Sequence, residues 1–503
     1  MKLDELKETH KDYKSNIDAW NLYGMAYEGG LPFIKYCLKI NSRESLANWK
    51  SRQEEGLNFN FASSIIDLLN FYLTEKQPVR YLGGLDTDPL WQMFLQDCDY
   101  NGTNYDTFMN ETNKFASVYG YVGILVNKAS TTFDTKQQEI DRGAYPYLTM
   151  YTPPNILDWK FIKNDIGRPI LEYLKLKEPD NKYLLYSQNA WIMYEIDKNN
   201  NVIEVGSGEN TLGEIPFLWS FNIRNVASKL SGISDIKEIA PITASICRNI
   251  SSGDEIIKFA GFPMLRLPKD REGTISVGGN VLVSPDGVLD FDPELGDAGK
   301  PDWLESKVLE PIEAILGWTD RKADEIFRLS HLSGVHGQRK SNNEVASGLA
   351  LRYEGQQLNS LLNKKATQMC ETELLILKYW LTWQNKKELI KSIKILRKRE
   401  FATDDLTVSL DLNLKAIASI QSKLFNLKVK EKISKQVLPD LTDAEYDTIK
   451  REIDESYLPV VQATPINPFK PNQDMTGTKP NFNMMQNQKL MEKIIQLKSV
   501  LNS

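Results

Sequence analysis

Two amphipathic segments of helix length flank a short stretch rich in glycine and proline, and a much longer helical pattern follows them. The two segments cover 234–260 and 301–330. In both, apolar residues recur mostly every three or four positions, the spacing that places side chains on one face of an α-helix. We therefore expect two paired helices, with mild kinks at Pro241 and Pro311, where proline removes a backbone donor.

The stretch between these segments, 261–300, has the pattern of short strands and tight turns. It contains V-G-G-N-V-L-V-S-P-D-G-V-L-D-F-D-P, in which β-branched runs are separated by G-G-N and P-D-G. Those short sequences favour turns. We expect one helix, a small β module and a second helix to form a single protruding unit.

A polar segment, S-H-L-S-G-V-H-G-Q-R-K-S-N-N, interrupts the helical pattern after the second segment. Its residues favour a loop. Apolar spacing resumes at Glu344 and continues to Trp383, and at about 1.5 Å per residue such a helix is roughly 60 Å long. Asn342 or Asn343 can cap its first turn. The sequence thus predicts a helix longer than those of ordinary globular cores.

The rest of the chain predicts an α+β fold. Residues 1–50 read as mostly helical, and Asp88-Pro89 suits the cap and first turn of another helix. Residues 119–221 alternate like strands and are rich in aromatic side chains. After Trp383 comes a basic run, 386–399, and the last predicted regions are helices within 414–462 and an extended linker with a short terminal helix in 463–503.

Composition excludes several classes of protein. The net charge of -6 argues against a tight, general nucleic-acid binder. The four cysteines lack C-x-x-C spacing, so we expect reduced thiols and neither a zinc site nor a disulfide framework. The N-terminus lacks the apolar core of a secretory signal, and no apolar run approaches the ~20 residues of a membrane span. We expect a protein made in the cytosol, with no cofactor and no membrane partner.

Candidate catalytic chemistry is sparse. Asp86-Thr87-Asp88 has the D-x-D form of some metal-dependent glycosyltransferases, because two such carboxylates can share a divalent cation. Asp88 precedes Pro89 and fits helix capping better, and the pair Asp97 and Asp99 is an equally weak signal. The phosphate-loop sequence G-x-x-x-x-G-K-[ST] does not occur. We expect no enzyme, and a transferase that uses Asp86 and Asp88 is the alternative.

The order of these segments resembles the portal proteins of tailed bacteriophages, of the siphophage-like type. The resemblance is carried by F-A-S-S-I-I-D-L-L-N-F-Y-L-T-E-K-Q-P-V-R-Y at 61–81, F-A-S-V-Y-G-Y-V-G-I-L-V at 115–126 and Y-T-P-P-N-I-L-D-W at 151–159. Later come I-P-F at 215–217, S-G-I-S-D-I at 231–236 and A-S-G-L-A-L-R-Y-E at 346–354. No single phrase is diagnostic. Their order and spacing across 61–383 carry the match.

The resemblance implies a ring of identical subunits, usually twelve, around a DNA channel at one vertex of the capsid. In the terms used for that family, the wing would be formed by 1–233 and 344–413, and the stem by 234–260 and 301–330. The clip would be 261–300, the tunnel loop 331–343 and the crown 414–462. The implied partners are double-stranded DNA held without sequence specificity, the terminase large subunit, the major capsid and scaffolding proteins, and a head-completion or adaptor protein. The implied location is the virion, after assembly in the host cytoplasm. Another ring-forming connector component is a second alternative, and it would lack the long helix after the loop.

Three sets of site residues follow from the resemblance. The tunnel loop would face DNA through His331, Ser333, Val335, His336, Gln338, Arg339, Lys340, Ser341, Asn342 and Asn343. The clip would dock terminase or the adaptor through Val281, Leu282, Val283, Ser284, Pro285, Asp286 and Phe291. The stem would pack between subunits through Ile239, Ile242, Ile246, Leu304, Val308, Ile312 and Ile315.

Two charged regions keep alternative interpretations. Arg339 and Lys340 can contact DNA phosphates or pair with acidic residues such as Asp324 or Glu325 of another subunit. The two loop histidines can change the charge of the loop near neutral pH. The basic run 386–399 is either a solvated amphipathic face, with Leu389, Ile390, Ile393, Ile395 and Leu396 packed inward, or a contact for packaged DNA.

Overall fold

The chain divides into two units, 1–403 and 404–503, and each is described by itself. The computed structural model describes residues 2–42, 44–129, 133–225, 232–261, 264–266, 302–304, 309–332, 348–399, 401, 415, 417, 419, 420, 422–437 and 443–455. Among these residues, no helix has both the length and the apolar character needed to cross a membrane.

The first unit begins with five helices. They are α1 (Leu3–Lys7), α2 (Lys11–Glu28), α3 (Gly30–Cys37), α4 (Leu46–Glu55) and α5 (Phe61–Thr74). Polar side chains fix the starts of α4 and α5, where Ser45 and Asn60 accept hydrogen bonds from the N–H groups of Asn48 and Ser63. Gly29 separates α2 from α3 at φ 67°, a left-handed angle that glycine adopts without strain.

Two antiparallel sheets follow, joined to further helices. The elements are β1 (Val79–Tyr81), η1 (Leu85–Thr87), α6 (Pro89–Gln96), α7 (Tyr105–Tyr119), β2 (Tyr121–Asn127), α8 (Lys136–Asp141), β3 (Tyr147–Tyr151), η2 (Pro153–Asn155), β4 (Ile156–Lys163), β5 (Pro169–Glu178), β6 (Lys182–Ser187), β7 (Ala190–Ile196), β8 (Val202–Glu209) and β9 (Phe217–Phe221). One sheet has the order β3-β2-β9, and the other is the meander β4-β5-β6-β7-β8. Every residue of β2 except the last is buried, so this strand is central to the unit.

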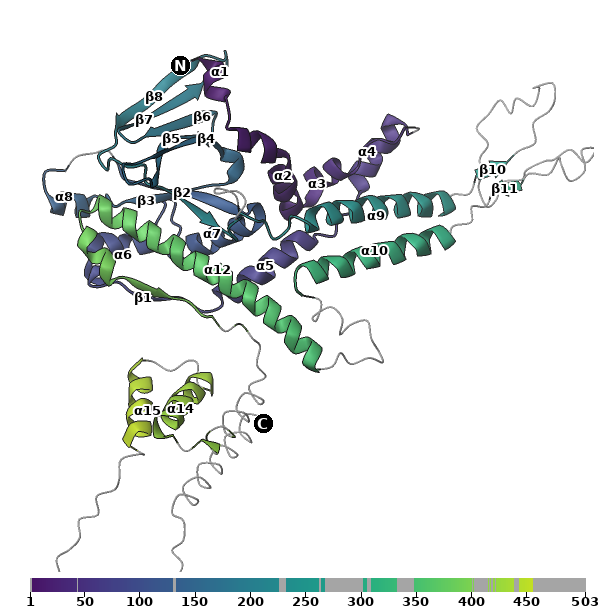
Figure 1. The fold of residues 1–503 in the computed structure, drawn as a ribbon. Helices are drawn as coiled ribbons and strands as arrows, with labels where there is room; N and C mark the ends of the chain where they lie inside the picture. The colour runs from purple at the N-terminus through teal and green to yellow at the C-terminus, as the bar shows by residue number, and fades with distance from the viewer. Residues whose placement is uncertain are drawn as a thin grey trace, which may run out of the picture. The chain divides into compact units, whose positions relative to one another are not determined.

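The remaining elements of the first unit include its longest helices. They are α9 (Ile239–Gly261), β10 (Met264–Arg266), β11 (Asp302–Leu304), α10 (Leu309–Leu329), α12 (Gly348–Trp383), η4 (Lys387–Ser392) and β12 (Lys394–Leu396). Figure 1 shows α9 and α10 running side by side away from the other helices, with the ribbon β10-β11 beyond their far ends. A second small ribbon pairs β1 with β12.

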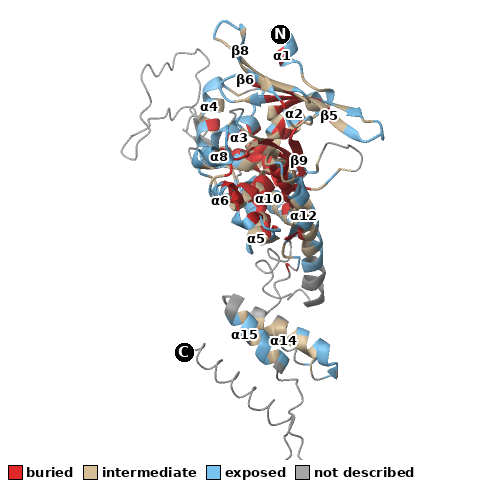
Figure 2. Ribbon diagram, turned by 90° about the vertical axis from the view of Figure 1, so that its left-hand side faces the viewer, coloured by how far each residue is buried: buried red, intermediate tan, exposed pale blue. Residues whose placement is uncertain are grey.

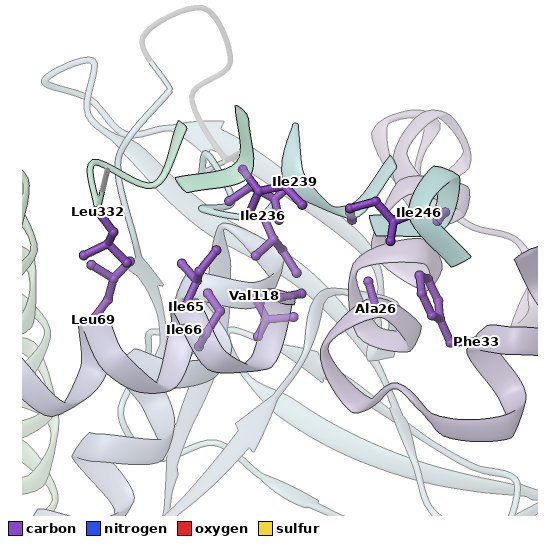
Figure 3. Close-up of a cluster of buried hydrophobic side chains, with 14 of the residues drawn as sticks. Ala26, Phe33, Ile65, Ile66, Leu69, Val118, Ile236, Ile239, Ile246 and Leu332 are labelled. Carbon is purple, nitrogen blue, oxygen red and sulfur yellow. The ribbon is translucent and has the colours of Figure 1, made fainter. Parts of the chain in front are cut away.

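The long helix α12 contributes to two buried clusters. Leu362, Ala366 and Met369 belong to a cluster formed with α2, α3, α5 and α9, part of which is drawn in Figure 3. About two and three turns beyond Met369, Ile376 and Trp380 belong to a second cluster with α6, α7 and β2. A third cluster lies around the two sheets. The buried residues in Figure 2 follow these clusters, and the outer surfaces of the helices are exposed.

The second unit contains two described helices, α14 (Lys423–Val437) and α15 (Asp443–Glu455). They contact each other, and Leu424 is among their exposed apolar residues. The predicted helices within 414–462 are therefore confirmed over these two ranges. The predicted linker and terminal helix, 463–503, lie outside the described residues.

Several predictions of local structure are confirmed. The described chain is mixed α and β, and strands fill most of 119–221. The side chain of Asp88 accepts the N–H of Leu90, with Pro89 as the first residue of α6. The long helix is described from Gly348 to Trp383, and its predicted start at Glu344 lies outside the described residues.

Other predictions are corrected. Residues 302–304 form strand β11 and pair with β10, so the helix expected from 301 begins only at Leu309, and Leu304 is not a helix residue. Pro241 and Pro311 are the third residues of α9 and α10. Within the first turn, a helix leaves its N–H groups unpaired in any case, so there is no backbone bond for these prolines to break.

Candidate functional site

The paired helices α9 and α10 are the element that the sequence singled out, and side chains hold them together in antiparallel register. Lys322 Nζ donates to Ser245 Oγ at 2.7 Å, and Asn249 Nδ2 lies 3.5 Å from Thr319 Oγ1. Further out, the absence of a side chain at Gly253 makes room for Ile315, whose Cγ2 lies 3.8 Å from where a Cβ would be. The sequence positions of these contacts rise on one helix as they fall on the other.

The N-terminal half of α9 packs against its own chain. Ile239 and Ile246 are buried against α2, α3 and α5, as Figure 3 shows for both side chains. Lys258 pairs with Glu55 and Glu255 lies 3.7 Å from Arg52, so ion pairs connect the last turn of α4 to the outer part of α9. The interpretation of Ile239 and Ile246 as subunit-packing residues is therefore corrected, since each is used within one chain.

The outer half of the pair has apolar side chains without cover in the single chain. Leu309, Leu316 and Trp318 of α10 are 72%, 60% and 54% exposed, and Ile257 of α9 is also exposed. Ile242, Ile312 and Ile315 are half-buried. Val308 lies outside the described residues. Two helices alone cannot bury both of their faces, so this surface is suited to contact with another chain.

A groove of about 350 Å³ lies between the two helices on one side. It is lined by Pro241, Ile242, Ser245, Trp318, Arg321, Lys322 and Glu325. Lys322 lies over the Trp318 ring, 5.4 Å from its centroid. Burial and then the positive charge of Arg248 lower the pKa of Lys322, so positive charge is concentrated here.

The C-terminal end of α10 closes with a left-handed residue. His331 has φ 59°, its N–H donates to the Arg328 carbonyl, and the next N–H, of Leu332, donates to the Phe327 carbonyl at 3.0 Å. This pair of bonds is a Schellman ending. It turns the chain so that Leu332 enters the core while the His331 side chain is exposed. His331 therefore ends α10, and the other predicted tunnel-loop residues, Ser333 to Asn343, lie outside the described residues.

A buried polar latch fixes the base of α9 to α12. Lys365 of α12 is fully buried, forms an ion pair with Asp235, and donates to Ser117 Oγ at 2.9 Å. Asn222 Nδ2 donates to the other carboxylate oxygen of Asp235 at 2.8 Å. The loop before α9 thus binds α7, α12 and the end of β9 at one point.

Two glycines let the backbone approach this latch. Gly120 has φ 92°, and a Cβ on it would lie 2.4 Å from the carbonyl oxygen of Gly232. A Cβ on Gly232 would lie 1.8 Å from the Gly120 carbonyl oxygen. Any larger residue at either position would separate these segments. The contact brings Ser234 close enough to donate to the Val118 carbonyl at 2.5 Å.

A second buried ion cluster lies further along α12. Glu373 is fully buried and accepts from Arg80 of β1 and, at 2.8 Å, from Arg397 just after β12. Arg80 also donates to Asp106 at 2.6 Å, and its guanidinium lies over the Tyr105 ring. The small β1-β12 ribbon is therefore tied to α7 and α12 by charge.

The carboxylates of the enzyme alternative are used for structure. Asp88 caps α6 and pairs with Lys386. Burial acts to raise the pKa of Asp88, but Lys386 and the Leu90 N–H outweigh it and hold this pKa below its usual value. Asp86 is exposed and does not share this environment. Among the described residues, no cluster of three or more His, Cys, Asp or Glu side chains is arranged to hold a metal ion.

Asp97 and Asp99 have a similar structural role. Asp97 accepts the N–H of Gly102 at 2.9 Å, and Asp99 accepts the N–H groups of Asn101 and Thr103. Burial raises the pKa of Asp99, and these hydrogen bonds lower it by more. The two carboxylates therefore shape the turn between α6 and α7.

The basic run after α12 is partly neutralised. Lys386 pairs with Asp88, Arg397 with Glu373, and Lys398 with Glu75 at 2.8 Å. Lys387, Lys391 and Lys394 are exposed. Leu389, Ile390, Ile393 and Ile395 pack inward, whereas Leu396 is exposed, so the inward placement of Leu396 was wrong. The run forms the 3-10 helix η4 and the strand β12, so its apolar residues do not follow the spacing of an α-helix.

Sequence reasoning missed both charged clusters on α12. The available signal was a charged residue inside the apolar stripe of the long helix. Lys365 stands at helical spacing between Leu362 and Met369, and Glu373 stands between Met369 and Leu377. A charge in such a position is seldom buried without a partner. The partners, Asp235, Arg80 and Arg397, were not identifiable because they are far away in sequence or separated by the turn after α12.

The predicted clip residues Val281, Leu282, Val283, Ser284, Pro285, Asp286 and Phe291 lie outside the described residues. Only the ribbon β10-β11 is described in this region, and it pairs Met264 with Leu304 and Arg266 with Asp302. One strand therefore follows α9, its partner precedes α10, and the two pair as expected for a β module between the helices.

Comparison with known proteins found matches among solved structures alone. No protein-family model and no curated protein matches the chain. Among solved structures, a chain of "Virion of native gene transfer agent (GTA) particle" is 9% identical with a TM-score of 0.41, and the match covers 76% of this chain and 92% of that chain. A chain of "Neck of empty GTA particle computed with C6 symmetry" is 8% identical with a TM-score of 0.42, over 82% and 95% of the two chains. At these scores, the likeness assigns neither a fold nor a function to this chain.

Proposed function

We propose that this protein is a phage portal subunit, which forms a ring-shaped DNA channel at one vertex of a capsid. The ring admits double-stranded DNA during packaging, docks the terminase large subunit and then a head-completion or adaptor protein, and releases DNA during ejection. It contacts the major capsid and scaffolding proteins during assembly in the host cytoplasm and is part of the finished virion. The protein has no catalytic step.

One observation carries the proposal. The outer half of the α9-α10 pair exposes Leu309, Leu316 and Trp318 on a helix whose remaining surface is largely charged. Burial of apolar surface contributes about 25 cal/mol for each Å², so covering these side chains would favour association of the helices with another chain. A ring of identical chains provides such a neighbour on both sides of every pair.

The arrangement of the described elements supports a geometric mechanism. α9 and α10 would form the channel wall, and 331–343 would lie at its constriction. The polar latch at Asp235 and Lys365 holds the base of this wall to α12, so the wall is anchored to the wing by buried charge. The ribbon β10-β11 and the clip beyond it would bind the terminase and the adaptor.

DNA would pass without a tight grip. The chain carries a net charge of -6, and many phosphate contacts would slow a sliding duplex. Contacts from the loop to phosphates carry no base information, which suits the transport of any sequence.

The test is assembly of the full chain, measured by native mass spectrometry and by electron-microscopy class averages over a range of concentrations. Closed rings with a central hole are the expected result. Leu309→Asp is expected to shift assembly to higher concentration by tenfold or more, which is about 1.4 kcal/mol. The matched control is Ile166→Asp, since Ile166 is 71% exposed in a turn between β4 and β5. A wild-type chain that stays monomeric at all concentrations would refute the proposal.

A further inference from the structure

The two sides of helix α10 differ in charge, although both are apolar at their centres. Successive residues are about 100° apart around a helix. Ile312, Ile315 and Thr319 face α9. On one side of this line, Leu309, Glu313, Leu316 and Asp320 fall within an arc of roughly 60°. We call these four residues the acidic flank.

The opposite side of α10 is the groove described above. Trp318, Arg321, Lys322 and Glu325 line it, together with Pro241, Ile242 and Ser245 of α9. We call this surface the basic groove. Arg248 adds a third positive charge to Arg321 and Lys322, because it acts on Lys322 from α9. The acid in the groove, Glu325, is already paired with Arg328.

Three charges on these two surfaces have no ion-pair partner among the described residues. In the part of the chain that the structure describes, no residue forms an ion pair with Glu313, Asp320 or Arg321. Lys322 uses a neutral hydroxyl and the face of an indole ring. An acidic surface with Leu309 and Leu316 therefore complements a basic surface with an exposed tryptophan.

We infer that the acidic flank of one copy docks in the basic groove of the next copy, with the same contact repeated around a ring. This inference rests on the proposed function and specifies how its subunits meet. Asp320 and Arg321 are one residue apart, so they lie at nearly the same height on α10. Copies related by rotation about an axis parallel to α10 would place Asp320 of one copy opposite Arg321 and Arg248 of its neighbour.

Charge also decides the type of contact. A two-fold contact would place the same surface of both copies together, which sets Glu313 and Asp320 against each other on one side or Arg248, Arg321 and Lys322 against each other on the other. Like charges that are brought together in an interface cost several kcal/mol. The head-to-tail contact pairs opposite charges at every interface and leaves no end unpaired in a closed ring.

The test is a charge reversal in the full chain, read out as the concentration at which half of the protein is assembled. Arg321→Glu and Asp320→Arg are each expected to raise this concentration at least about tenfold. The chain that carries both substitutions is expected to return to within about threefold of wild type, because each interface then pairs reversed charges. The control is Glu204→Lys, at an exposed position of β8 that belongs to neither surface, and it is expected to assemble like wild type.

A second measurement does not depend on assembly strength. The variant with Asp320→Cys and Arg248→Cys is oxidised and run under denaturing, non-reducing conditions. Head-to-tail contacts give a ladder of linked species above the dimer, whereas a two-fold contact stops at dimers. A variant with only one of these two substitutions, which adds one cysteine to the four native ones, is expected to give no ladder. Circular dichroism and the unfolding temperature of every variant exclude loss of fold as the cause.

The outcomes separate the inference from the proposed function. Rings that form with unchanged midpoints in both single reversals, or that are not restored by the double reversal, overturn the inference and leave the portal proposal standing. Loss of DNA binding by Arg321→Glu rings without a change in assembly assigns the groove to the channel and also overturns it. A wild-type chain that never assembles overturns both.

Discussion

Replacing Lys365 by methionine is expected to destabilise the chain by about 3–5 kcal/mol, because the substitution leaves a buried carboxylate without its cation. Lys365 is fully buried, and Asp235 is 8% exposed at its side chain. After Lys365→Met, Asp235 keeps the Asn222 amide at 2.8 Å on one oxygen and loses the ammonium on the other. Hydrogen bonds to charged groups contribute about 1.5–3 kcal/mol each, which agrees with the range from ion-pair removal.

The double variant separates the ion pair from simple packing. With Asp235→Asn added, the uncompensated charge disappears, so the pair of substitutions is expected to cost less than the sum of the two single changes, by about 2 kcal/mol or more. Neither single variant can relieve its charge by exposure, since the site lies between α7, α12 and the loop before α9.

The assay is denaturant unfolding followed by tryptophan fluorescence, with Lys364→Met as the matched control. Lys364 precedes Lys365 and is exposed, so its loss is expected to change stability by less than about 0.5 kcal/mol. A cost below about 1 kcal/mol for Lys365→Met, or strict additivity in the double variant, would refute the argument that this ion pair is a buried, energetically coupled latch.

Two further predictions concern helix ends. His331→Val is expected to be less stable than His331→Gly by about 1 kcal/mol or more, because a β-branched residue resists the left-handed angle that ends α10; equal unfolding midpoints would contradict the Schellman ending. For Asp88, whose pKa is lowered in the fold, the stabilisation is present above the ordinary carboxyl pKa and is lost as pH falls through the lowered one. Asp88→Asn is therefore expected to reduce the loss of stability measured by unfolding at acid pH, and an unchanged acid profile would count against the Lys386 and Leu90 contacts as its cause.

Local signals in the sequence identified much of the fold. Asp88-Pro89 predicted the start of α6 because capping depends on neighbouring residues alone. The alternation in 119–221 predicted strands because the side-chain period is a property of the strand itself. Asp302, Trp303 and Leu304 were assigned to a helix because a three-residue strand is too short to show a period.

The candidate site was less accessible to this reasoning. The apolar stripe of α9 is real, but a stripe does not reveal whether its partner lies in the same chain, and Ile239 and Ile246 pack within the chain. The structural role of the charges on Lys365 and Glu373 can be inferred only when their partners, which are distant in sequence, are known. The charge difference between the two sides of α10 can be recognised only when the position of α9 is known, because α9 defines which residues of α10 lie on either side of the contact.

The helix α12 has a mechanical consequence. It contributes Leu362 to one core and Trp380 to another, and these residues are separated by 18 positions, or about 27 Å along the axis. A close-packed core resists small tilts of an embedded rod, because any tilt opens voids on one side and overlaps atoms on the other. A push on the end of α12 near Gly348 would thus be passed on as displacement of the whole rod, and both cores would have to change their packing together or not at all.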